Sequence, residues 1–265
     1  MWKRFIGVCV LVALAVFQSV AAYAQPSTVI DVPTRPGVTV RYLWQSPQQP
    51  KAVVILMVGG NGGVRLGADG SLGGMGGNFL ARSRAQFVQQ GLAVALMDAP
   101  SDRQVAPFLG GFRQTPEHMA DIKALIADVR QRSQRPVALV GTSRGTQSAA
   151  AAAIALSDSG GPDALVLTST ILTDPQSRAV PKMALEQLRI PVLLMHHQQD
   201  GCKHCAFADL PALREKLPAD HAVRLYEGGN NVGDPCEAMA FHGFNGLEAR
   251  VVQDLSTWLI AKLAP

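Results

Sequence analysis

Short apolar runs alternate along the chain with segments of helical periodicity. Residues 51–58 (KAVVILMV) form a continuous apolar run rich in β-branched residues, which predicts a strand buried on both faces. Residues 115–132 open with Thr-Pro-Glu, an N-cap followed by a first-turn proline and an acid, and then repeat apolar residues at helical spacing. The same patterns predict strands at 92–97, 136–140, 164–167, 191–195 and 223–226 and helices at 78–90, 145–156, 210–217 and 247–263.

This order of elements predicts the fold class. Strands separated by helices are typical of a doubly wound, mostly parallel α/β sheet, here one domain over residues 25–265. Residues 28–44 instead alternate apolar and polar positions around a turn at Pro36 and Gly37, which predicts an antiparallel hairpin at the sheet edge. The stretch 168–190 follows the strand after the 145–156 helix and predicts a short cap. Its Leu172, Val180, Met183, Leu185 and Leu188 are expected to form the apolar underside of that cap over an acyl pocket.

Residues 1–24 have the pattern of a secretory signal peptide. Lys3 and Arg4 precede an apolar run over 5–17, and Ala22, Tyr23 and Ala24 form a small-x-small cleavage site. The alternative is an uncleaved anchor, but Gln18 and Ser19 interrupt the run. The sequence therefore predicts cleavage after Ala24, export to the periplasm or the medium, and no stable membrane insertion of the mature chain.

Composition and charge narrow the function classes. With 48% hydrophobic and 17% charged residues, the chain is expected to fold rather than to be disordered. A formal charge of +4 is too small to favour a nucleic-acid binder. Three cysteines follow the predicted cleavage site, Cys202, Cys205 and Cys236, and after export they are expected to form a disulfide and leave one thiol.

The residues with the clearest chemistry are Gly-Thr-Ser-Arg-Gly at 141–145, between a predicted strand and a predicted helix. This is the GxSxG pattern in the context of a nucleophile elbow. The turn is so tight that side chains other than hydrogen at the flanking glycines would collide with the neighbouring strand and helix. It exposes the hydroxyl of Ser143 above the sheet and places the N–H of Arg144 at a helix N-terminus, where a developing oxyanion would be stabilised.

With this elbow the sequence resembles the α/β-hydrolase family, in which an acid and a histidine follow the serine in that order. The resemblance assigns the acid to Asp200, just past the predicted strand 191–195, and the base to His242, before the closing helix. It assigns the second oxyanion donor to the loop after strand 51–58, at the N–H of Asn61 or Gly62. Asp209, Asp234 and Glu227 are other acids in reach, but none lies so clearly on a strand-end turn.

The cysteines lie close in sequence to the proposed acid and base. A bridge between Cys202 and Cys236 would fasten the Asp200 loop to the His242 loop, and Cys205 remains an alternative partner for Cys236. The rival interpretation is redox chemistry of the Cys202-x-x-Cys205 motif. A thioredoxin-like fold would need far less chain and would leave the elbow unexplained.

The remaining candidates concern substrate and cofactor. Arg144, Arg65 and Arg103 are candidate contacts for an acidic substrate, and the glycine-rich stretch 67–77 is a candidate flexible flap. His118 and His221 are expected at the surface, while His196 or His197 is expected to line the site. No metal-ligand spacing and no phosphate-binding glycine motif appears in the sequence, so no metal or cofactor is predicted.

The pattern as a whole predicts an exported serine hydrolase that cleaves small or medium carboxylic esters through an acyl-enzyme, with a small-molecule ester as its substrate. A peptidase, thioesterase or amidase would use the same three residues. A catalytically silent binding protein of the same fold is the alternative from another class, and the occupation of all three positions disfavours it.

Overall fold

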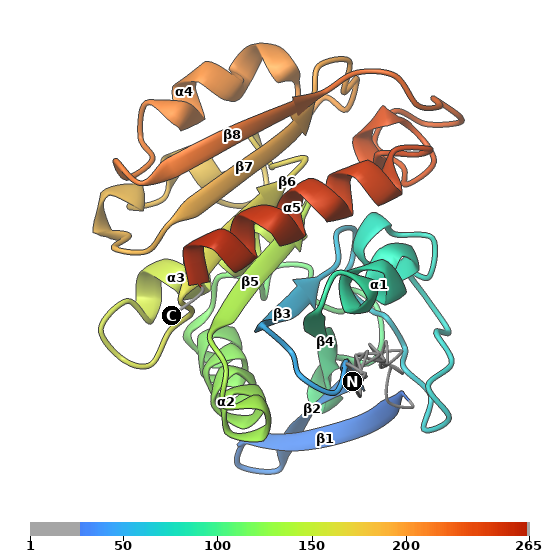
Figure 1. The fold of residues 1–265 in the computed structure, drawn as a ribbon, viewed down its shortest axis with the longest axis vertical. Helices are drawn as coiled ribbons and strands as arrows, with labels where there is room; N and C mark the ends of the chain where they lie inside the picture. Colours follow the sequence, from blue (N-terminus) through green and yellow to red (C-terminus); the bar gives the residue numbers. More distant parts are fainter. Residues whose placement is uncertain (1–26, 264–265) are drawn as a thin grey trace, which may run out of the picture.

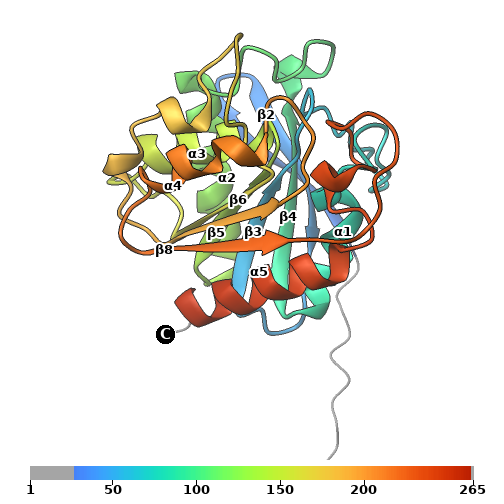
Figure 2. The same ribbon diagram turned by 90° about the horizontal axis from the view of Figure 1, so that it is seen from above.

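The computed structural model describes residues 27–263, so the predicted signal peptide lies outside the described residues. Eight strands form one open sheet in the order β1-β2-β4-β3-β5-β6-β7-β8 (Figures 1 and 2). β2 pairs antiparallel with both β1 and β4, and all remaining neighbours are parallel. The strands are β1 Thr28–Arg35, β2 Val38–Gln45, β3 Ala52–Met57, β4 Leu92–Pro100, β5 Val137–Thr142, β6 Ala164–Thr168, β7 Val192–His197 and β8 His221–Tyr226.

Helices cover both faces of the sheet, which confirms the predicted α/β architecture. Figure 2 shows α1 (Phe79–Gln89) and α5 (Glu248–Leu263) on one face and α2 (Pro116–Ser133), α3 (Gly145–Ala155) and α4 (Leu210–Arg214) on the other. β3 contributes side chains to the hydrophobic core on both faces of the sheet, because successive side chains of a strand point to opposite faces. Val53 and Ile55 pack in the layer of α2 and α3, whereas Val54 and Leu56 pack in the layer of α1 and α5.

Local sequence explains where the elements begin and end. Thr115 caps α2, its side chain accepting from the N–H of His118, and Pro116 occupies the first helical position, as predicted. The edge hairpin of β1 and β2 is also confirmed. α4 is shorter than predicted, and β8 begins two residues earlier because its half-exposed edge position needs no continuous apolar run. Short 3₁₀ turns complete the chain: η1 Ser101–Arg103, η2 Val180–Lys182, η3 Leu185–Gln187, η4 Phe207–Asp209 and η5 Phe241–Gly243.

The predicted apolar residues of the segment after β6 do not form the underside of a substrate pocket. Their five side chains are buried in the main core layer together with α3 and α4 rather than over an acyl pocket: Leu172, Val180, Met183, Leu185 and Leu188. The segment therefore completes the hydrophobic core, and η2 and η3 are turns within that layer. Over residues 27–263, no helix is both long enough and apolar enough to cross a membrane.

Candidate active site

Ser143 lies on the tight turn between β5 and α3, as the elbow motif predicted. Its φ of 51° is in the left-handed region, which a residue with a side chain rarely adopts. The neighbouring glycines are required by close approach: a Cβ at Gly145 would lie 2.0 Å from the carbonyl oxygen of Met57, and one at Gly141 would lie 2.6 Å from that of Gly145. The side chain of Ser143 is only half-buried. The backbone strain thus holds a serine hydroxyl at the carboxyl end of the sheet.

Asp200 and His242 form a buried pair at the same end of the sheet. The loop after β7 carries Asp200, and η5 before α5 carries His242, 42 residues later. Nδ1 of His242 lies 2.9 Å from Oδ2 of Asp200, whose other oxygen accepts the N–H of Cys202 at 2.9 Å. Nε2 of His242 is buried and has no hydrogen-bond partner within residues 27–263. The carboxylate therefore fixes the ring with an unused nitrogen available for proton transfer.

Three contacts hold the loop that presents His242. The hydroxyl of Ser169 donates to the carbonyl oxygen of His242 at 2.7 Å, and the Arg82 guanidinium donates to that of Gly243 at 2.6 Å. Phe244 follows in the left-handed region and packs its ring against Phe79 at a centroid distance of 5.1 Å. The position of the imidazole is thus set by α1, by the end of β6 and by the aromatic core.

The predicted Cys202–Cys236 disulfide is present, and Cys205 is a buried free thiol. The bridge joins the Asp200 loop to the loop that leads to His242. Closing a loop of this sequence separation, 34 residues, stabilises a fold by about 3 to 4 kcal/mol in the chain-entropy model. Burial, and next the Asp200 charge, raise the pKa of Cys205 well above its usual value, so its reactive thiolate form is disfavoured. The arrangement does not fit the alternative of CxxC redox chemistry.

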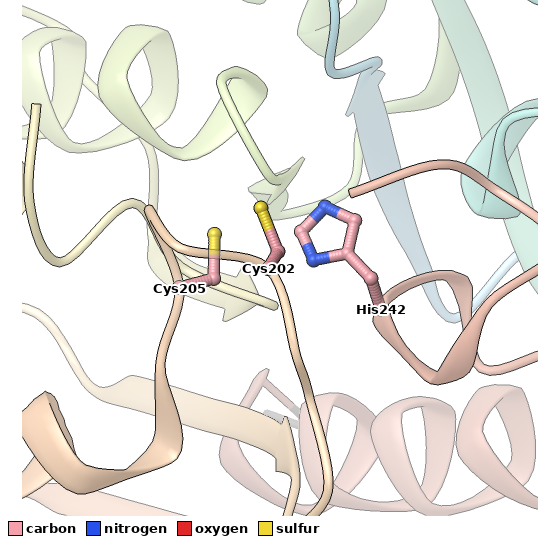
Figure 3. A group of neighbouring side chains, drawn as sticks. All are labelled: Cys202, Cys205 and His242. Atoms are coloured by element: carbon pink, nitrogen blue, oxygen red, sulfur yellow. The ribbon is translucent and has the colours of Figure 1, made fainter. Parts of the chain in front are cut away.

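Cys202, Cys205 and His242 lie close enough to resemble a metal site, with ligand atoms within 4.8 Å of one another. Figure 3 shows the two sulfurs side by side and the imidazole approaching from the chain before α5. A metal of this kind is bound by thiolates. Because the sulfur of Cys202 is already bonded to Cys236, the cluster does not fit a metal in the oxidised protein.

Ser143 and His242 line the same cavity of about 200 Å³. Its walls come from the elbow, the loop after β3, the glycine-rich stretch, the segment after β6 and the disulfide: Gly60, Met75, Arg144, Ile171 and Cys236. Gly59 packs directly against the elbow, since a Cβ on it would lie 2.8 Å from Cβ of Ser143. A small acyl group could therefore lie against the serine with the backbone of residues 59–60 beside it.

The loop after β3 is held from behind by Arg113. Nη2 of this guanidinium donates to the carbonyl oxygens of Val58, Gly59 and Gly60 at 3.2, 3.2 and 3.1 Å. In a trans peptide the C=O and the following N–H point in opposite directions. Because the carbonyls of Gly59 and Gly60 point toward Arg113, the N–H groups of Gly60 and Asn61 point away from it.

This geometry changes the expectation for the second oxyanion donor. The N–H of Gly62 donates within its own loop, to the carbonyl oxygen of Gly59 at 3.1 Å, and is not free for a substrate. Asn61 lines a neighbouring chamber instead of the cavity around Ser143. Gly60 lines both, and its N–H has no acceptor within the described chain. Gly60 is thus the better placed donor, although the sequence pointed to the two residues after it.

His118 was expected at the surface from its place in the sequence, and this expectation is wrong. His118 is 1% exposed, and its Nε2 lies 3.1 Å from Oγ of Ser148, which also accepts from Nη1 of Arg113 at 3.0 Å. Burial and the neighbouring charges of Arg113 and Arg35 lower the pKa of His118 to about 3. The imidazole is therefore a neutral part of the support beneath Arg113.

This buried histidine predicts sensitivity to acid. Between pH 6.5 and about 3 the unfolded chain binds a proton at His118 that the native state excludes. The free energy of unfolding therefore decreases as the pH is lowered, by up to about 1.4 kcal/mol per pH unit. Urea denaturation at pH 7 and 4.5 should show a smaller loss in His118→Gln than in wild type. His221→Gln, at the half-exposed start of β8, is the matched control. An unchanged loss in His118→Gln would refute the assignment.

The other sequence candidates have structural roles or lie elsewhere. His196 and His197 are both buried and bond backbone carbonyls, those of Cys205 at 2.7 Å and Gly228 at 2.9 Å, so neither lines the Ser143 cavity. The side chain of Arg103 lies over the ring of Phe112.

The glycine-rich stretch is not a loose flap. Hydrogen bonds fold it back on itself, from the N–H of Gly73 to the carbonyl oxygen of Arg65 at 3.0 Å and from that of Gly74 to Val64 at 2.9 Å. Both oxygens of Asp98 accept backbone N–H groups of residues 64–66, which fixes the start of the same loop. The side chain of Arg65 is exposed on this fixed loop, outside the Ser143 cavity. Of the stretch, only Met75 reaches that cavity.

The architecture of this chain is similar to that of known proteins. No protein-family model matches the sequence. No curated protein matches it either. Among solved structures it is similar to dienelactone hydrolase from Anabaena variabilis, with a TM-score of 0.64 at 15% identity over 90% of this chain and 98% of that one.

Two further structures are similar over nearly their whole length. The esterase domain of a Rhodothermus marinus protein has a TM-score of 0.60 at 14% identity, covering 90% of this chain and 100% of that one. A lidless α/β serine hydrolase from Xanthomonas campestris has a TM-score of 0.57 at 14% identity, covering 88% and 94%. At this level of identity the likeness concerns architecture. The chain has the α/β-hydrolase fold.

Proposed function

We propose that this protein is a serine hydrolase that cleaves carboxylic esters through an acyl-enzyme on Ser143. The observation that carries the proposal is the buried Asp200–His242 pair, 2.9 Å apart, whose histidine has an unused Nε2 and lines the same cavity as the elbow serine. A strained serine, an oriented imidazole and a buried carboxylate are the three groups that acyl transfer by a triad uses. The solved structures with esterase or hydrolase in their names support this reaction class by analogy of fold.

In this mechanism Oγ of Ser143 attacks the ester carbonyl carbon while Nε2 of His242 accepts the hydroxyl proton. The imidazolium then protonates the leaving alcohol, and Asp200 stabilises the positive ring through Nδ1. A water molecule repeats the sequence in the opposite direction, giving its proton to His242 and releasing the acid. No group outside these three residues is needed for the proton transfers.

The tetrahedral oxyanion would be stabilised by the N–H groups of Arg144 and Gly60. Arg144 stands at the N-terminus of α3, where backbone N–H groups and the helix dipole favour negative charge. Arg113 is a positioning residue in this scheme: it holds the carbonyl of Gly59 and so aims the N–H of Gly60. The cationic guanidinium adds a favourable field behind the donor.

Export is part of the proposal. We infer that residues 1–24 are removed and that the mature chain works in the periplasm or outside the cell. The disulfide supports an oxidising compartment, in which such bonds form and persist. Because the bridge joins the loops of Asp200 and His242, we also expect oxidation to support the active arrangement.

The direct test is labelling of the purified mature protein with a fluorophosphonate, which reacts with activated serines. Mass spectrometry of the peptides should find the adduct on Ser143 in wild type and none in Ser143→Ala. Phosphonylation of another residue, or none in protein shown to be folded by circular dichroism, would overturn the proposal.

A further inference from the structure

A second, larger chamber adjoins the Ser143 cavity. It has a volume of about 880 Å³ and shares Gly60 and Arg144 with that cavity, so it opens beside the elbow and the loop after β3. A volume of this size is typical of a small-molecule site and exceeds the need of a short acyl group. A substrate bound at Ser143 could therefore extend into it.

The chamber has an unbalanced charge. Arg113, Arg144 and Arg178 line it, and no Asp or Glu is among its lining residues in the described part of the chain. Arg144 is compensated, because its guanidinium lies 2.8 Å from a carboxylate oxygen of Asp174 behind the wall. The other two arginines have no ion pair within residues 27–263, which leaves an excess of positive charge.

Arg113 is the more unusual of these two. It is 6% exposed, yet its side-chain hydrogen bonds go to three backbone carbonyls and to Ser148, all neutral groups. A buried cation without a counter-charge is costly, and here burial, and next the Arg144 charge, lower the pKa of Arg113 to about 9. An anion in the chamber would offset this cost.

Arg178 is the second unpaired arginine that lines the chamber. Its carbonyl oxygen accepts from Nε2 of Gln114 at 2.7 Å and from Nε2 of Gln147 at 3.1 Å, which fixes its backbone. The residue is exposed, and its guanidinium makes no hydrogen bond or ion pair within the described residues. An unpaired guanidinium on a fixed backbone is free to bind a carboxylate in bidentate fashion.

We propose that the chamber binds a carboxylate carried by the ester substrate, with Arg178 as the direct contact and Arg113 as the supporting charge beneath. This rests on the proposed function and narrows it from esters in general to anionic esters. The carboxylate would lie several bonds from the scissile carbonyl, because Arg178 lines the chamber and not the Ser143 cavity. Specificity would then come from a site separate from the acyl-transfer residues.

The test compares two 4-nitrophenyl esters of the same length. One is the half-ester of adipic acid, which carries a free carboxylate, and the other is the ester of adipamic acid, in which a neutral amide replaces that carboxylate. After subtraction of spontaneous hydrolysis, kcat/KM should favour the anionic ester by about tenfold or more in wild type. Arg178→Gln should reduce this preference about fivefold or more, through a lower kcat/KM for the anionic ester. Arg214→Gln, an equal loss of charge at an exposed position on α4, is the matched control and should preserve the preference.

Equal kcat/KM for both esters, or a preference that survives Arg178→Gln, would overturn the anionic site. Turnover of the neutral ester and fluorophosphonate labelling of Ser143 report on the proposed function separately. If neither ester is turned over, calorimetric titration of the protein with adipate decides the matter. Binding that Arg178→Gln weakens and Arg214→Gln does not would support the site, and no binding would refute it.

Discussion

Replacement of Ser143 by alanine is expected to lower kcat for a 4-nitrophenyl ester by about 10⁴- to 10⁶-fold. The nucleophile is lost while the oxyanion donors and the substrate cavity remain, so KM should change little. His242→Ala should cost a similar factor, and the double variant should be no slower than either single variant, because the two residues act in one step. Asp200→Asn should retain more activity. Initial rates of the four variants measure these effects.

Stability measurements separate loss of chemistry from loss of fold. Ser143→Ala keeps the left-handed backbone strain, so its melting temperature should stay within a few degrees of wild type. Ser143→Gly relieves that strain, worth about 1 kcal/mol, and should melt about 2 to 4 °C higher while also being inactive. An alanine variant that retains turnover would remove Ser143 from the mechanism.

The elbow was predictable because its determinants are local. A buried strand, two glycines that must lack a Cβ, and a helix of small residues lie within residues 137–155, so Ser143 could be placed from the sequence alone. Asp200 and His242 are not local to it, but parallel strands bring their carboxyl ends to one edge of the sheet. The order of the elements and the expected disulfide were therefore enough to predict that the loops of Asp200 and His242 lie close together.

The residues that sequence reasoning missed are buried for reasons that act over long distances. Arg113 and His118 are of types that usually lie at the surface, and nothing in their neighbouring residues shows that α3 will supply Ser148 between them. The apolar residues of 168–190 illustrate the converse. Their pattern indicated burial correctly but not the partner, which is the core layer of α3 and α4 rather than a substrate pocket.

Arg113→Met is expected to lower kcat by about 100- to 1,000-fold with little change in KM, the loss typical of one missing oxyanion donor. The variant removes the three hydrogen bonds that hold the carbonyls of Val58, Gly59 and Gly60, so the Gly60 N–H loses its orientation. Arg113→Lys keeps a charge but offers no planar fork and should be intermediate. Steady-state rates on a neutral ester show whether the loss of activity lies in kcat or in KM.

A purely structural role for Arg113 makes different predictions. The rate constant for phosphonylation of Ser143 should fall in parallel with kcat in Arg113→Met, because the phosphonyl oxygen develops its charge at the same N–H groups. Ser148→Ala is the matched control: it removes the fourth hydrogen bond of the guanidinium, at 3.0 Å, but leaves those to the loop, and should stay within about tenfold of wild type. If Arg113→Met is folded and both rates remain near wild type, the loop is rigid without its arginine and the charge beneath it does not contribute to catalysis.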